Sequence, residues 1–90
     1  MFITTQEARV KLCESIIESE EVERLLNVDF HLNSLESARE VDAPVRARMA
    51  LIRAGRYAIA GDFLRASVSY LDAIRKEAFV NDENKKRAII

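Results

Sequence analysis

Turn-forming residues and cysteine are scarce in this 90-residue chain, which contains two Gly, one Pro, one Cys and no Trp. Strands must be joined by turns, so this scarcity, together with much Ala, Leu, Arg and Glu, favours helices. The lone Cys13 can form no internal disulfide and has no partner for a metal site. We therefore expect a reducing compartment and a buried, apolar role for this thiol.

Long apolar runs are also missing. The first 17 residues, MFITTQEARVKLCESII, are interrupted by Glu7 and Glu14. This is the pattern of neither a signal peptide nor a membrane anchor, so a cytoplasmic protein is expected. Apolar residues make up 49% and charged residues 32% of the chain, a globular mixture. At this length we expect a single domain, 1–90, with a thin core and a tendency to self-associate.

Catalytic residue types are sparse as well. His31 is the single histidine and has no obvious Ser or Cys partner, and the two glycines, Gly55 and Gly61, form no phosphate loop. The pair Glu20-Glu21 lies in an acidic run typical of a solvated helix face. We therefore expect no enzyme activity, no cofactor and no metal.

Charge is unevenly distributed along the chain. Residues 1–42 hold ten acids and four bases, whereas residues 43–90 hold five acids and ten bases, which together give the net charge of −1. This division suggests that one half faces the other, within a chain or between chains. Nucleic acid is an unlikely partner for a chain with this balance and few aromatic residues.

The spacing of apolar residues predicts an all-α fold, a small bundle of three to five helices. A capping box at Thr4-Thr5-Gln6-Glu7 should start the first helix, and a shift of its apolar face predicts a break near Ser19. We expect Asn27 to end the next segment, residues 28–33 to be irregular, and a new cap at Asn33.

The basic half predicts a sharply bounded antiparallel hairpin over residues 43–80. Asp42 and Pro44 should start a helix that is apolar on two sides and therefore packed between two others. Gly61 should stop it, and Asp62 should cap the second helix. The polar run Asn81-Asp82-Glu83-Asn84 is expected to interrupt that helix and leave residues 81–90 as a tail.

The hairpin resembles a single tetratricopeptide repeat over about residues 47–80. The matching positions are Ala54, Tyr57, Gly61, Phe63, Ala66, Tyr70 and Ala73. Arg53 and the missing proline near Ala78 depart from the pattern, and residues 11–44 do not repeat it. Microtubule-interacting-and-trafficking domains have a similar hairpin. The repeat resemblance implies a groove for a partner helix or extended peptide, lined by Arg48, Leu51, Gly55, Ala58 and Ile59.

Arginine is the most informative polar residue type, because ten of the fourteen bases are Arg. The candidate partner-binding residues all lie on the first hairpin helix, and they are Arg46, Arg48, Leu51, Arg53, Arg56 and Ile59. These arginines could pair with the acidic half, in the chain or in a dimer, or bind an acidic protein partner.

The leading hypothesis is a non-enzymatic protein-binding module, such as an adaptor, an assembly or secretion chaperone, or a small inhibitor, in a homo-oligomer or hetero-complex. A second hypothesis is an oligomer that binds an anionic ligand or nucleotide, with Arg53 and Arg56 on phosphate and Tyr57 against a base. A third is a purely structural subunit.

Overall fold

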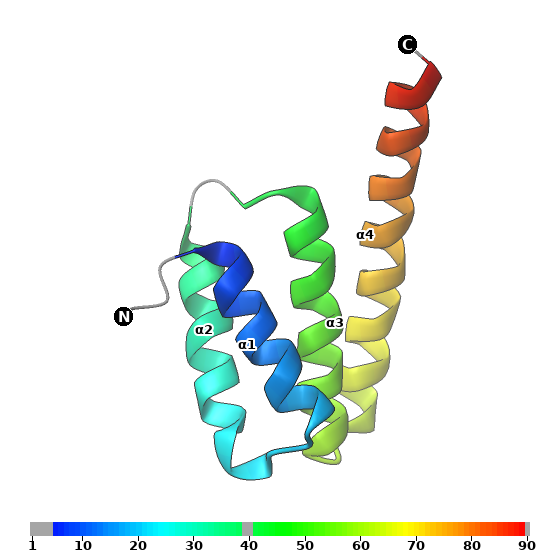
Figure 1. Ribbon diagram of the computed structural model, residues 1–90. Helices are drawn as coiled ribbons and strands as arrows, with labels where there is room; N and C mark the ends of the chain where they lie inside the picture. Colours follow the sequence, from blue (N-terminus) through cyan, green and yellow to red (C-terminus); the bar gives the residue numbers. More distant parts are fainter. Residues whose placement is uncertain (1–4, 39–40, 90) are drawn as a thin grey trace.

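A computed structural model describes residues 5–38 and 41–89 of the chain, which fold into a small all-α bundle (Figure 1). The described elements are α1 (Gln6–Glu18), the short 3₁₀ helix η1 (Val22–Arg24), α2 (Leu25–Ser37), α3 (Ala43–Ile59) and α4 (Phe63–Ile89). No strand occurs within these ranges. The predicted fold class, including the antiparallel hairpin formed by α3 and α4, is confirmed.

Both ends of α1 follow from local side-chain and backbone chemistry. The Thr5 hydroxyl accepts a hydrogen bond from the Ala8 backbone N–H at 3.1 Å, which is half of the predicted capping box. Glu7 does not complete the box; its carboxylate binds Arg48 instead. Helix α1 ends at Glu18, with Ser19 as its C-cap, and Glu20 then adopts a positive φ of 51°. The break near Ser19 is therefore confirmed, and Ser19 stands at the C-terminal end of α1.

The prediction for residues 27–33 was wrong. Asn27 does not end a helix, Asn33 does not cap one, and α2 runs without interruption from Leu25 to Ser37. Its buried residues are Leu25, Val28, Leu32 and Leu35. Their spacing of three, four and three residues forms one helical stripe, so packing of that stripe outweighs the weak helix propensity of the polar residues between them.

The start of the hairpin and the turn between its two helices were predicted correctly. Asp42 occupies the N-cap position of α3 with Pro44 in the first turn, although the Asp42 side chain makes no capping hydrogen bond. The helix ends at Ile59, and Gly61 takes the positive φ of 81° that ends the turn. The Asp62 carboxylate then accepts from the Arg65 backbone N–H at 3.3 Å, as a cap for α4.

The polar run at residues 81–84 does not interrupt α4, so the predicted tail was wrong. The helix continues for 27 residues to Ile89. This part of α4 still lies beside the start of α3, where Val80 and Asn84 line a concavity together with Pro44. The helix thus still borders α3 at Asn84, past the point where its apolar pattern fades.

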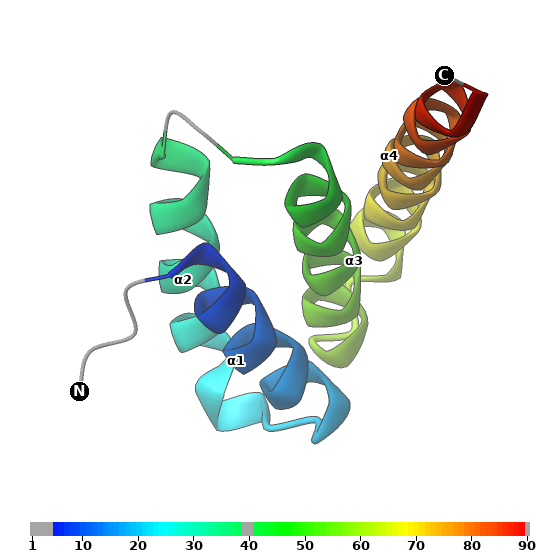
Figure 2. The ribbon, with the colours of Figure 1, turned by 45° about the horizontal axis from the view of Figure 1, so that its top comes forward.

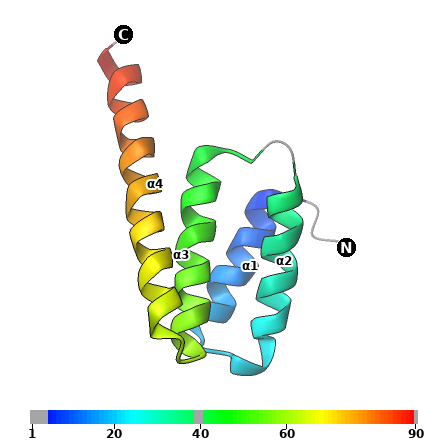
Figure 3. The same ribbon diagram turned by 180° about the vertical axis from the view of Figure 1, so that it is seen from behind.

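Helices α1, α2 and α3 share one hydrophobic core. Its fully packed members are Val10, Cys13, Ile16, Val28, Leu32, Leu35, Met49 and Ile52. Helix α4 lies on the other side of α3, as seen from both directions (Figures 2 and 3). The prediction that the first hairpin helix is sandwiched between other helices is therefore confirmed.

Alanines form the contact between α3 and α4. Ala66 and Ala73 are the buried apolar residues of α4 among its described side chains. Opposite them, Ala47, Ala50 and Ala54 of α3 are buried but do not belong to the core of α1, α2 and α3. Small side chains let the two backbones approach closely, but they bury little apolar area.

Candidate interaction surface

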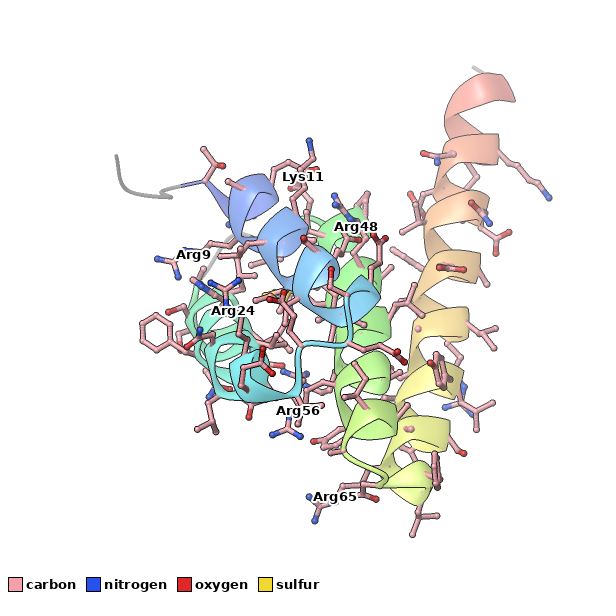
Figure 4. The ribbon with its side chains drawn as sticks, turned by 60° about the horizontal axis from the view of Figure 1, so that its bottom comes forward. Arg9, Lys11, Arg24, Arg48, Arg56 and Arg65 are labelled. Atoms are coloured by element: carbon pink, nitrogen blue, oxygen red, sulfur yellow. The ribbon has the colours of Figure 1, made fainter. Side chains whose placement is uncertain are left out.

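Arg48 connects the basic hairpin to the acidic first half. Its guanidinium donates to Glu7 at 2.7 Å and to Glu14 at 2.5 Å, and both carboxylates belong to α1. The hydrogen bonds to Glu14 and Glu7 raise the pKa of Arg48, and the bond from Arg48 lowers the pKa of Glu7 below its ordinary value. Figure 4 shows Arg48 on the side of α3 that faces α1.

Arg53 and Arg56 form ion pairs with carboxylates of α2 in the same way. Arg56 forms a two-pronged pair with Asp29, with N–O distances of 2.9 and 3.0 Å, which raises the pKa of Arg56. Arg53 contacts Glu36 at 2.5 Å. The fourth candidate arginine, Arg46, donates from Nε to the Val41 carbonyl at 3.2 Å. Three of the four arginines therefore pair with the acidic half inside the chain.

The seam between α3 and α4 has a charged edge. Side chains from both helices and from α2 meet there around a small concavity. They include Glu36, Arg46, Arg53, Asp72 and Lys76. Asp72 and Lys76 also pair with each other along α4, at 2.7 Å. Carboxylates and cations alternate on this edge, so it carries no strong charge of one sign.

The opposite edge of the seam faces α1 and is apolar. Arg48 of α3 and Glu77 of α4 line one concavity there. Leu51 follows Arg48 by one helical turn, while Tyr70 and Ile74 precede Glu77 by two turns and one turn. Leu51, Tyr70 and Ile74 therefore lie along the same edge, and all three are exposed. We call these three residues the hairpin edge.

A second apolar set covers the face of α4 that points away from α3. Leu64, Val68 and Leu71 fall on the side of the helix opposite the buried Ala66 and Ala73, and Phe79 continues the row to the edge where it borders Ala43 and Arg46 at the start of α3. We call these four residues the outer stripe. Large apolar side chains of α4 are exposed by 42–79%, more than single scattered exposures would explain. The spacing of the stripe was visible in the sequence, but which face of α4 lacks cover was not.

The residues proposed for an anionic ligand do meet at one place. A concavity of about 530 Å³ is lined by Arg53, Arg56, Tyr57 and Arg65, together with Asp29 and Asp62. Two guanidinium groups lie near the Tyr57 ring, Arg65 at 5.9 Å and Arg56 at 6.0 Å from its centroid. However, the two aspartates already pair with Arg56 and Arg65, so an anion would have to displace them.

His31 lies beside Arg9, and Cys13 lies in the hydrophobic core. His31 Nδ1 lies 3.2 Å from an Arg9 guanidinium nitrogen, and partial burial and the Arg9 charge lower the pKa of His31. Cys13 is fully buried in the core, which raises the pKa of its thiol to about 11. Within residues 5–38 and 41–89, no three His, Cys, Asp or Glu side chains gather as a metal site, and no helix is long and apolar enough to cross a membrane.

In comparisons with known proteins, no family model, no curated protein and no solved structure matches this chain. The resemblance to a tetratricopeptide repeat therefore remains an expectation from the sequence. The surface itself supplies the basis for any functional proposal.

Proposed function

We propose that this chain is a non-enzymatic protein-binding module that receives an amphipathic helix of a partner protein along the hairpin edge. The observation that carries the proposal is the exposure of Leu51, Tyr70 and Ile74 on one edge of the α3–α4 seam. A helix presents apolar anchors at intervals of three, four and seven residues, which suits such a row of side chains.

The pairing of the arginines changes the kind of partner that we propose. Arg48, Arg53 and Arg56 already hold carboxylates of α1 and α2, so they are poor receptors for an acidic partner. Apolar anchoring by Leu51 and Ile74 is then the main source of affinity, as in interfaces whose energy comes from a few buried side chains. The internal ion pairs instead keep α1 fixed beside the edge.

Affinity capture from the native host tests this proposal. Wild-type protein is compared with Leu51→Glu and Ile74→Glu, and Leu26→Glu on α2, an equally drastic change at a residue that is 76% exposed, serves as control. A charge at an anchor position should weaken binding by about 30-fold or more. One partner should be lost from both edge variants and retained by the control, with circular dichroism unchanged. Equal recovery in all four samples would reject the hairpin edge.

The concavity around Tyr57 supports a second candidate, an anionic ligand such as a nucleotide. Three arginines line it, and a base could stack on the ring. A thermal-shift series with nucleotides tests this candidate, with Tyr57→Ala and Arg65→Ala as variants. A ligand at 100 times its Kd should stabilise the fold by about 2.7 kcal/mol. The absence of any shift at millimolar nucleotide would remove this candidate and leave the protein-binding proposal intact.

A further inference from the structure

The outer stripe is a separate surface from the hairpin edge. Because α4 contacts α3 through Ala66 and Ala73, Leu64 and Leu71 point away from α3 and the rest of the chain. Figure 3 shows α4 as the outermost helix, joined to the bundle through α3 and extending beyond it at its C-terminal end. Arg75 lies between Leu71 and Phe79 in the sequence and on the same side of α4.

The chain exposes more surface than a compact protein of its size. Its accessible surface is 6506 Å², and a compact monomer of 10.3 kDa is expected to expose about 5400 Å². The radius of gyration is 13.9 Å, against about 12 Å for a compact chain of 90 residues. The excess of about 1100 Å² exceeds the roughly 800 Å² that one partner buries in a standard interface.

We infer that a second copy of this chain covers the outer stripe, with the two α4 helices packed antiparallel about a two-fold axis. The midpoint of the stripe lies at Leu71 and Asp72. A two-fold axis at that level places Leu64 of one copy opposite Phe79 of the other, so apolar side chains meet along the whole stripe. Leu64, Val68 and Leu71 face away from α3, so the two bundles lie on opposite sides of the helix pair, and Leu64 of one copy meets Phe79 beside the start of α3 in the other.

Charge favours this orientation over a parallel one. Arg75 makes no ion pair with any described side chain of its own chain. In the antiparallel pair, Arg75 lies opposite Val68 of the second copy, and the two Arg75 side chains are about two helical turns apart. A parallel, in-register pair would instead place the two Arg75 side chains next to each other, which is unfavourable.

The mass in solution tests the inference directly. Sedimentation velocity on the full chain, from about 5 to 500 µM, should show a shift from 10.3 kDa toward twice that mass. Leu71→Glu should raise the dimer Kd by about 30-fold or more, since it buries a charge at the centre of the interface. Leu26→Glu on α2 should remain a dimer. A wild-type monomer at 500 µM, or an unchanged dimer of Leu71→Glu, overturns the proposal.

Disulfide crosslinking tests the orientation. An equimolar mixture of Leu64→Cys and Phe79→Cys proteins should form a mixed crosslinked dimer under mild oxidation, whereas Leu64→Cys alone should not crosslink. The buried Cys13 does not compete, because its thiol is inaccessible in the fold. Self-crosslinking of Leu64→Cys overturns the antiparallel arrangement. Partner capture by Leu71→Glu tests the proposed function separately, because this variant leaves the hairpin edge unchanged.

Discussion

Gly55 marks the closest approach of α1 to α3, and Gly55→Ala tests that contact. A Cβ at this position would lie 2.6 Å from Ile17 Cγ2, far inside ordinary van der Waals contact. Because Cγ2 is bonded directly to the Ile17 Cβ, it cannot swing away without moving the whole side chain. Overpacking of this kind costs about 1–3 kcal/mol, whereas replacing Gly by Ala within a helix gains about 1 kcal/mol. We expect a net loss of about 1 kcal/mol.

Removing the obstructing methyl group should reverse the sign. In an Ile17→Ala background the added Cβ no longer meets Cγ2, so Gly55→Ala should stabilise the fold by about 1 kcal/mol through helix propensity. The two substitutions should therefore show a coupling energy of about 2 kcal/mol. Urea unfolding of the four proteins, followed by circular dichroism, measures this cycle; 1 kcal/mol corresponds to about 4–8 °C in Tm at this size.

Gly61 supplies the matched control. It has positive φ, and no atom lies within 4 Å of a Cβ built there. Gly61→Ala should cost about 1–2 kcal/mol through backbone strain alone and should be additive with Ile17→Ala. If Gly55→Ala stabilises the wild-type chain, or if its effect is the same with and without Ile17, the close contact between α1 and α3 is incorrect.

Two further predictions concern ionisable groups. Burial raises the pKa of Cys13 to about 11, so the folded state holds a proton that the unfolded state releases from about pH 9 upward. Stability should therefore fall as the pH rises from 9 to 11, and Cys13→Ala should lose this dependence in urea titrations. The pKa of Glu7 is lowered by Arg48, so its contribution is present above pH 4.5 and is lost as the pH falls through the folded-state pKa. Glu7→Gln should flatten the acid limb; an identical acid limb in both proteins would contradict the ion pair.

Local signals in the sequence predicted the hairpin well and the acidic half less well. Pro44, Gly61 and Asp62 act on the backbone within a few residues, so their effects are readable from sequence. Asn27 and Asn33 also favour helix ends locally, but both lie within α2, so their local preference gave the wrong prediction. The burial of Val28 and Leu32 against α1 and α3 determines that segment, and sequence spacing alone does not show which partners are present.

The arginines show the same limit for the candidate site. Their number and their position on one helix predicted either internal pairing or a binding surface. Pairing of Arg48 with α1 and of Arg56 with α2 depends on how the helices cross, over separations of 34 and 27 residues. Likewise, the apolar residues of α4 were recognised, but their exposure follows from the alanine contact that turns the other face of α4 toward α3.

The same alanine contact predicts that α4 is the least protected helix of the isolated chain. Each buried Ala contributes one methyl group to the α3–α4 contact, whereas α2 buries four Leu and Val side chains. Amide hydrogen exchange should therefore be faster in α4 than in α2 when the chain is monomeric, as in Leu71→Glu. In wild-type protein at high concentration, protection should increase across Leu64–Phe79 and remain constant in α2. Equal protection of α2 and α4 in the monomer would contradict this prediction. It would mean that the contact with α3 alone is enough to stabilise α4, without cover of the outer stripe.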